Sequence, residues 1–426
     1  MNVGSLLPRH ARYRPDHLAV VCGPHRLTFR EHAARVNRLA NALLALGLRK
    51  GDKVAIVLPN CVELLEAYRA CALMGFVSVP LSPLLRGAGL SSLLRDSDTV
   101  AVIACTAMVA ALDEVRDELP EIPADRWILT DAPADGSGAP GYASYARLTR
   151  AASPAPPPSP EITDDDVYNI IYSSGTTGQP KGIVHTHYIR GMYCTQFAAQ
   201  YRMTPESVVM HAGSLVFNGS FVTLMPAWYQ GCTYVLQERF DAAAFIDTVE
   251  RERVTHVMMV PSQIVAVMNA PNFAPQKLRS LEMLCSVGAP WHREHKERLL
   301  PILPHSLYEL YGLTEGIITV LDSTDFAAHM DSVGTPIPFT EMKVVGDDGR
   351  ELPPGEVGEI VGRSPMLMPG YYKRPDLTAQ AIRDGWLYSG DVGAFDEAGF
   401  LHLVDRKKDM IITGGVNVFP KDIEEV

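Results

Sequence analysis

A glycine- and hydroxyl-rich segment that ends in lysine, YSSGTTGQPKG at 172–182, has the residue types that hold a phosphate chain. Its glycines let backbone N–H groups approach a ligand, and its hydroxyls and lysine add neutral donors and one positive charge. These residues are Ser173, Ser174, Gly175, Thr176, Thr177, Gly178, Lys181 and Gly182. The segment is not a Walker A loop, because Gly182 stands where serine or threonine should follow the lysine. By itself it is equally typical of a polar loop between two strands.

Two later segments carry groups suited to the rest of a nucleotide. YGLTEG at 311–316 offers a flat aromatic face, a hydroxyl and a hard oxygen for Mg²⁺, in Tyr311, Thr314 and Glu315. YSGDVG at 388–393 contains Asp391, whose carboxylate can accept both ribose hydroxyls. Taken singly, each segment also fits an ordinary turn at a strand end.

Together with DRKKD at 405–409, these segments resemble the adenylate-forming superfamily, which comprises acyl- and aryl-CoA synthetases, peptide-synthetase adenylation domains and beetle luciferases. The motifs occur in the family's order and the resemblance covers almost the whole chain. It implies that Lys181 holds the β- and γ-phosphates and that Glu315 binds Mg²⁺. It also implies that Tyr311 and Gly288 enclose adenine, and that Asp391 with Arg406 holds the ribose.

The resemblance assigns the complete site residue by residue. The catalytic residues are Thr176, Lys181, Thr314 and Glu315, of which Glu315 is the magnesium ligand. The remaining ATP or AMP contacts are Ser173, Ser174, Gly175, Thr177, Gly178, Gly288, Ala289, Pro290, Glu309, Leu310, Tyr311, Gly312, Asp391 and Arg406. The hinge is Lys408, about which a small C-terminal domain turns before a thiol attacks. The required small molecules are ATP, Mg²⁺ and, as co-substrate, CoA.

The acyl and CoA sites are less strongly indicated. Family members carry an aromatic–histidine pair, whose histidine often helps to shape the carboxylate end of the acyl site, where this chain has Phe217 and Asn218. The expected acyl pocket comprises Phe217, Asn218, Phe221, Val287 and Gly312, although plain core packing explains these residues about as well. Arg239 and Gly415 are the expected CoA contacts, with a surface arginine as the alternative for Arg239.

The family's catalytic lysine for adenylation lies on a Gly-Lys loop near the end of the C-terminal domain. This sequence has no such loop before Val426. We therefore expect a truncated C-terminal domain, and a chain that binds ATP and acid but adenylates slowly by itself.

Composition restricts the class of protein. The chain has 426 residues, 47% hydrophobic and 20% charged, which suits a large buried core and more than one domain. A net charge of −11 disfavours nucleic acid as a partner. Seven cysteines without a CxxC pair, no secretory signal and no bilayer-spanning apolar run predict a cytoplasmic protein. His185 and His187 lack the further ligands that a structural zinc site requires.

Apolar periodicity predicts an α/β fold with two packed doubly wound sheets and a small β-rich, barrel-like subdomain. Thr28 should cap a helix that reaches Leu46, and Gly75 should end a helix over 62–74. Further helices are expected at 90–95, 221–229, 242–253, 262–269 and 293–300. Strands are expected at 54–58, 100–104, 167–171, 182–186, 208–210, 233–236, 256–260, 283–287 and 307–311. The Ala/Pro-rich segment 131–160 should be an exposed connection.

The predicted domains are 1–404, a large AMP-binding domain, then the hinge at 405–409 and the start of a C-terminal domain at 410–426. Within the large domain we expect α/β subdomains over 1–206 and 207–332 and a β-rich subdomain over 333–404. The predicted function is an ATP-dependent carboxylic acid:CoA ligase. The alternatives are an adenylation domain that loads a carrier-protein thiol, and a non-catalytic ATP or acyl-AMP binding protein. The identity of the acid, with an aromatic or medium-chain acid favoured, and the occurrence of a homodimer stay open.

Overall fold

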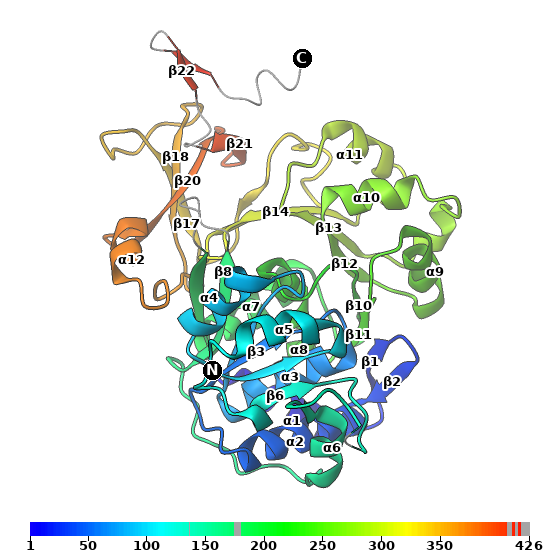
Figure 1. Cartoon of the computed structure of the whole chain (residues 1–426). Helices are drawn as coiled ribbons and strands as arrows, with labels where there is room; N and C mark the ends of the chain where they lie inside the picture. Colours follow the sequence, from blue (N-terminus) through cyan, green and yellow to red (C-terminus); the bar gives the residue numbers. More distant parts are fainter. Residues whose placement is uncertain (136, 174–179, 407–410, 414–415, 419–426) are drawn as a thin grey trace. The chain divides into compact units, whose positions relative to one another are not determined.

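The computed structural model describes residues 1–135, 137–173, 180–406, 411–413 and 416–418. Contacts divide the chain into two compact units (Figure 1). Unit 1 comprises Met1–Asp241 with Met368–Tyr372, and unit 2 comprises Ala242–Leu367 with Lys373–Val426. The predicted boundaries at 206, 332 and 404 were drawn from changes in sequence texture, and they stay predictions.

Unit 1 contains a seven-stranded sheet of order β7-β6-β5-β3-β4-β8-β9. All neighbours in it pair in parallel except β8 and β9, which are antiparallel. The unit also holds parallel pairs β10–β11 and β11–β1, with β2 antiparallel to β1. The strands are β1 (Leu18–Cys22), β2 (His25–Thr28), β3 (Lys53–Val57), β4 (Val77–Pro80), β5 (Thr99–Ala104), β6 (Trp127–Leu129), β7 (Ala143–Ser144), β8 (Val167–Ser173), β9 (Lys181–Thr186), β10 (Val208–His211) and β11 (Thr233–Leu236).

Helices connect most of these strands, as parallel pairing requires. The helices of unit 1 are α1 (Leu6–Tyr13), α2 (Phe29–Ala45), α3 (Val62–Met74), α4 (Gly87–Asp96), α5 (Val109–Arg116), α6 (Tyr145–Ala151), α7 (His187–Gln200) and α8 (Phe221–Gln230). Short 3₁₀ helices lie at Val3–Ser5, Thr106–Met108, Ala124–Arg126 and Asn218–Ser220. The β3 and β5 strands, with α4 and α5, bury one continuous apolar cluster.

Unit 2 combines a mixed ladder with a separate antiparallel sheet. In the ladder, β12, β13 and β14 are parallel, whereas β15 and β16 add antiparallel. The second sheet has the order β17-β18-β20-β19, with β21 also paired to β20. The strands are β12 (His256–Met259), β13 (Met283–Val287), β14 (Leu307–Gly312), β15 (Ile318–Leu321), β16 (Thr335–Pro336), β17 (Glu341–Val345), β18 (Gly358–Arg363), β19 (Ile382–Arg383), β20 (Trp386–Phe395), β21 (Leu401–Arg406), β22 (Ile411–Thr413) and β23 (Val416–Val418). The helices are α9 (Ala242–Glu252), α10 (Pro261–Met268), α11 (Arg293–Leu299) and α12 (Pro375–Ala381), with a 3₁₀ turn at Pro275–Leu278.

The α/β class and the change to β structure late in the chain are confirmed. Thr28 caps α2 through a capping box with Glu31, as the sequence pattern predicts. Gly75 ends α3 with φ +65°, a conformation that favours glycine. In the described part of the chain, no helix combines the length and the apolar character needed to cross a membrane.

The prediction for 131–160 is wrong in part. Within it, β7 pairs in parallel with β6, and α6 follows directly. Tyr145 of α6 is buried and its hydroxyl donates a hydrogen bond to Glu66 of α3, at 2.5 Å. The proline-rich composition hides this short strand and helix, because contacts with distant residues, rather than a periodic pattern, hold them. Arg38 of α2, for example, donates to Thr149 O and Ala152 O. Helices α1, α5, α7 and α12 were also not predicted from the sequence.

Unit 1 buries several imidazoles in their neutral form. Burial lowers the pKa of His10, His187 and His211 to about 4 and that of His32 to about 3. Positive neighbours lower the pKa of His10, His32 and His187 further, among them Arg69 beside His10 and His32. The unfolded chain exposes the same groups at an ordinary pKa of 6.5. Protonation of the unfolded state therefore destabilises the fold as pH falls.

We predict that the urea midpoint of unfolding is constant above pH 6.5 and falls between pH 6.5 and 4. Each buried imidazole should cost about 2 kcal/mol of unfolding free energy at pH 5 relative to pH 7.5. His211→Gln should reduce this pH dependence by the equivalent of one proton, whereas His305→Gln, at an exposed position, should not. A wild-type midpoint that is the same at pH 7.5 and pH 5 would contradict the assignment.

Candidate active site

The two ends of the predicted phosphate loop are fixed by a β-hairpin. Strands β8 and β9 are antiparallel, and Ser173 pairs directly with Lys181. The segment that should cradle phosphate, 174–179, therefore joins two paired strands, as the sequence pattern predicts. Its own residues Ser174, Gly175, Thr176, Thr177 and Gly178 lie outside the described residues.

A second segment, Met368–Tyr372, reinforces this hairpin. Tyr372 N donates to Gly182 O at 2.7 Å, Val184 N donates to Gly370 O at 3.3 Å, and Ile183 bridges Tyr371. The Lys181 ammonium lies 5.1 Å from the centre of the Tyr371 ring. A cation over an aromatic face is held in place without a carboxylate, and it stays available to a phosphate.

Gly182 is required by packing at the base of the hairpin. A Cβ there would lie 2.9 Å from Ile170 Cγ2 and 3.2 Å from the Tyr172 ring. The Tyr172 hydroxyl donates to Asp96 Oδ2 at 2.5 Å, and burial first, then this carboxylate, raises the pKa of the phenol. The Tyr172 side chain is thus anchored to Asp96 of α4.

The ends of β13 and β14 bring together the two residues expected to enclose adenine. These strands are parallel neighbours in which Val287 pairs with Leu310. Gly288 and Tyr311, the next residues along each strand, therefore lie at the same edge of the ladder. Gly288 has φ +87°, and a Cβ added to it would have Val260 Cγ1, at 3.8 Å, as its nearest neighbour. Gly288, Ala289 and Pro290 are exposed, so this turn can meet a ligand.

The rest of the YGLTEG motif forms the tight turn between β14 and β15. Gly316 N donates to Leu313 O, and Leu313 N donates to Ile317 O. Gly316 has φ +118°, and a Cβ on it would lie 2.1 Å from Met366 O, so no other residue fits. Thr314 and Glu315 lie in this turn, half-buried.

A hydrogen bond links the predicted adenine and ribose contacts. The Tyr311 hydroxyl donates to Asp391 Oδ2 at 2.8 Å. Asp391 N donates to Ser389 Oγ at 3.0 Å, and Ser389 Oγ donates to Ile360 O at 2.6 Å. Asp391 and Arg406 are directly paired residues of β20 and β21. The two predicted ribose contacts therefore share one register position.

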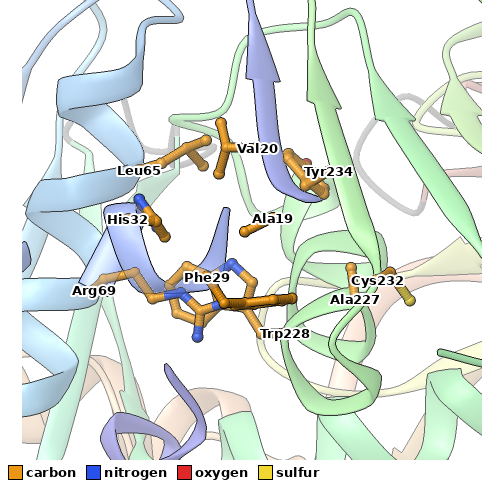
Figure 2. Close-up of a pocket in the computed structure, with 10 residues that line it drawn as sticks. All are labelled: Ala19, Val20, Phe29, His32, Leu65, Arg69, Ala227, Trp228, Cys232 and Tyr234. Atoms are coloured by element: carbon orange, nitrogen blue, oxygen red, sulfur yellow. The ribbon is translucent and has the colours of Figure 1, made fainter. Parts of the chain in front are cut away.

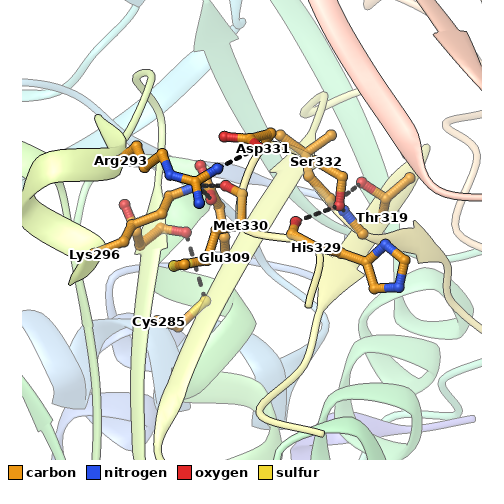
Figure 3. A network of polar contacts seen from close by, with 12 residues as sticks. Cys285, Arg293, Lys296, Glu309, Thr319, His329, Met330, Asp331 and Ser332 are labelled. Atoms are coloured by element: carbon orange, nitrogen blue, oxygen red, sulfur yellow. Dashed lines mark hydrogen bonds and ion pairs between the residues drawn. The ribbon is translucent and has the colours of Figure 1, made fainter. Parts of the chain in front are cut away.

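A buried ion pair links β14 to α11, two residues before Tyr311 in the chain. Lys296 of α11 contacts Glu309, and their side chains are 4% and 7% exposed. Lys296 Nζ also donates to Met330 O at 2.5 Å, while Arg293 on the same helix bonds Asp331 at 2.6 Å (Figure 3). The Glu309 carboxylate is thus occupied within the protein, so a nucleotide contact from this position would come from its backbone. The sequence reading missed Lys296, for which the HREHKE run gave no signal beyond a polar helix face.

The metal role assigned to Glu315 agrees with the way proteins bind Mg²⁺. Among the described residues, no group of three or more His, Cys, Asp or Glu side chains is placed to hold a metal. Mg²⁺ is commonly bound by one or two carboxylates together with substrate phosphates and waters. Glu315 alone, at the tip of a turn, fits that mode better than a site built only from protein ligands.

At the predicted acyl site, Asn218 belongs to a buried polar network. Arg190 Nη2 donates to Asn218 Oδ1 at 2.9 Å, and Asn218 Nδ2 donates to the Tyr193 hydroxyl at 3.2 Å. Arg190 is fully buried and also bonds Asn169 and His185, at 3.1 and 3.2 Å. Burial lowers the pKa of Arg190. The sequence reading missed Arg190, because it had no prediction for α7.

The predicted wall residues differ in exposure. Phe221 is fully buried, with its ring 5.5 Å from that of Tyr68, as in ordinary core packing. Phe217 is 58% exposed, and Val287 and Gly312 are half-buried at the ends of β13 and β14. Arg239 is exposed after β11. Lys408 and Gly415 lie outside the described residues, so the acyl, CoA and hinge roles stay predictions.

Comparison with known proteins identifies the class of enzyme that the sequence motifs predict. The family model described as "AMP-binding enzyme" matches residues 7–372. The chain is 36% identical to feruloyl-CoA synthase from Amycolatopsis sp, over 99% of this chain and 82% of that protein. It is 33% identical to the long-chain-fatty-acid–CoA ligase FadD13 from Mycobacterium tuberculosis, over 100% of this chain and 82% of that protein.

A solved structure is similar over the same extent. The crystal structure of ATP-bound MatB from Rhodopseudomonas palustris superposes with a TM-score of 0.88 at 28% identity, covering 100% of this chain and 83% of that one. The adenylate-forming fold is therefore confirmed. With the family match and the two CoA ligases, it supports ATP-dependent ligation of a carboxylic acid to CoA.

We predict that Glu309→Gln destabilises unit 2 by about 3–5 kcal/mol, because it leaves the Lys296 ammonium buried without a counter-charge. The double variant Lys296→Met, Glu309→Met should recover most of this loss, since it removes both charges. Urea unfolding followed by tryptophan fluorescence gives the comparison, with Arg293→Met as the exposed control on the same helix. Equal stability of wild type and Glu309→Gln would show that the ion pair does not stabilise unit 2.

Proposed function

The chain belongs to the family of AMP-binding enzymes, and from this premise we propose the following residue roles and substrate class. The reaction joins a carboxylate to the α-phosphorus of ATP, giving acyl-AMP and pyrophosphate, and then transfers the acyl group to the thiol of CoA. A carboxylate is a weak nucleophile that approaches an anionic centre. Catalysis must therefore come from positioning and from neutralisation of charge.

The single observation that most supports these roles is the hydrogen bond from Tyr311 to Asp391 at 2.8 Å. It holds an aromatic face and an acceptor for ribose hydroxyls at a fixed separation, beside the open turn at Gly288. One nucleoside can use all three. Arg406, paired in register with Asp391, is proposed as the second ribose contact.

The phosphate end of ATP is assigned to the segment that begins at Ser173 and ends at Lys181. Lys181 is proposed to hold the β- and γ-phosphates, and Thr176 and Thr314 to donate hydroxyl hydrogen bonds to phosphate oxygens. Glu315 is proposed to hold Mg²⁺, which when bound neutralises phosphate charge. Arg239 and Gly415 are the proposed CoA contacts, and Lys408 the hinge.

For the acid we propose an aromatic carboxylate, supported by the 36% identity to feruloyl-CoA synthase and by the polar Arg190–Asn218–Tyr193 network. Such a network can satisfy a polar ring substituent, which an alkyl chain lacks. A fatty acid is the second candidate, supported by the 33% identity to FadD13. The seven cysteines are all free thiols, which favours a reducing, cytoplasmic location. A homodimer stays a prediction.

We predict that Gly288→Ala weakens ATP binding at least about tenfold, measured by titration calorimetry, because a methyl group there keeps the adenine ring from the main chain. Gly349→Ala is the matched control. Gly349 also has a positive φ, +77°, in open space, so both variants should lose a similar 1–2 kcal/mol of stability, by the usual cost of this conformation. Unchanged ATP affinity in Gly288→Ala would exclude adenine from this turn.

We predict that ferulate gives more acyl-AMP and acyl-CoA than octanoate or palmitate when each is incubated with ATP, Mg²⁺, CoA and the chain. Mass spectrometry separates the products, and long incubations detect slow adenylation. Asn218→Leu should reduce the preference for ferulate about tenfold, since it removes one polar partner of the ring substituent. A preference for palmitate, or an acid preference unchanged by Asn218→Leu, would overturn the proposed substrate class. Acyl-AMP without acyl-CoA would point to a carrier-protein acceptor.

A further inference from the structure

Among the described residues, one arginine of unit 1 is buried without a carboxylate as counter-charge. Arg69 on α3 is 5% exposed, and its Nε and Nη1 atoms have no hydrogen-bond partner in the described part of the chain. Its guanidinium carbon lies 3.6 Å from the centre of the Trp228 ring, so the ring face offsets part of the desolvation. Arg190 is also deeply buried, with an Nη1 that has no partner among the described residues, but its Nε and Nη2 atoms hydrogen-bond three side chains.

Arg69 stays charged in this environment. Burial lowers its pKa to about 9, which still leaves the guanidinium protonated at neutral pH. Two groups raise the pKa of Arg69 electrostatically, Tyr168 and Cys194. Both are neutral at neutral pH, because burial raises the pKa of the Cys194 thiol to about 12 and also raises the pKa of the Tyr168 phenol. No carboxylate of the described residues forms an ion pair with it. An uncompensated buried charge costs several kcal/mol.

Arg69 lines a small cavity, and none of the described residues that line this cavity is a carboxylate. The cavity is drawn in Figure 2 and is lined by Ala19, Val20, Phe29, His32, Leu65, Arg69, Ala227, Trp228, Cys232 and Tyr234. Besides Arg69, His32 contributes an unpartnered Nδ1 atom and is 2% exposed. Its pKa of about 3 makes it a neutral imidazole, which can offer one N–H. The Cys232 thiol is neutral as well, with a pKa raised by burial to about 12.

We propose that this cavity is a binding site for one small monovalent anion, of which chloride is the physiological example. The cavity is small, at about 10 Å³, which excludes sulfate, phosphate and organic carboxylates. A water molecule, which is smaller than chloride, could accept a hydrogen bond but would leave the positive charge uncompensated. The anion would link α2 and α3 to α8, β1 and β11, which carry most of the lining residues, and so would stabilise unit 1 without taking part in catalysis.

The test is urea unfolding at constant ionic strength, in which sodium chloride progressively replaces sodium gluconate. Gluconate is too large for the cavity. The unfolding equilibrium constant should fall with chloride along a saturable curve, by about tenfold at a chloride concentration ten times the dissociation constant. Arg69→Met should abolish this dependence, whereas Arg12→Met, which removes an exposed arginine of the same unit, should preserve it. Wild-type stability that does not respond to chloride would overturn the proposal.

A second measurement needs no variant. Wild-type crystals exchanged into sodium bromide should show an anomalous scattering peak beside Arg69 and His32. A peak accompanied by the saturable chloride dependence supports the site. Either the lack of a peak or a peak without the dependence in solution, which would mean an adventitious ion only, overturns it.

Discussion

The parallel register of β13 and β14 is the constraint on which the candidate nucleotide site depends. Because Val287 pairs with Leu310, the next residues of both strands emerge side by side. One is a glycine with positive φ and the other a tyrosine whose hydroxyl reaches Asp391. A shift of this register by one residue would turn the Tyr311 side chain to the other face of the ladder and break its hydrogen bond.

Much of this arrangement could be predicted from sequence. Caps and stops such as Thr28 and Gly75 mark helix ends through local hydrogen bonds and backbone conformation, which depend on few residues. The order of the motifs identified the fold; the turn at Gly288 and the YGLTEG motif lie at the ends of β13 and β14, whereas YSGDVG lies within β20. The segment 131–160 was misread because its order comes from contacts between positions far apart in sequence, such as those of Tyr145 with Glu66 and of Arg38 with Ala152.

The buried charges could not be predicted for the same reason. Lys296, Arg190 and Arg69 look like surface residues on helices, and the partners that decide their roles come from distant elements. Glu309 was expected near the nucleotide, and the structure adds that its carboxylate is paired beneath Tyr311. Arg190 explains how an asparagine can occupy a position where the family carries histidine, since the amide oxygen accepts from a guanidinium. Composition and periodicity do not predict such pairs.

The central claim is that Asp391 receives the ribose hydroxyls of a nucleotide whose base meets Tyr311. The most direct measurement compares the affinities of ATP and 2′,3′-dideoxy-ATP for the wild type and for Asp391→Ala. The account predicts that removal of the ribose hydroxyls lowers the nucleotide affinity of the wild type about 10–100-fold, the equivalent of one charge-assisted hydrogen bond or more. The affinity of the variant should hardly change. Equal losses in both proteins would contradict it, because Asp391 would then not contact the ribose.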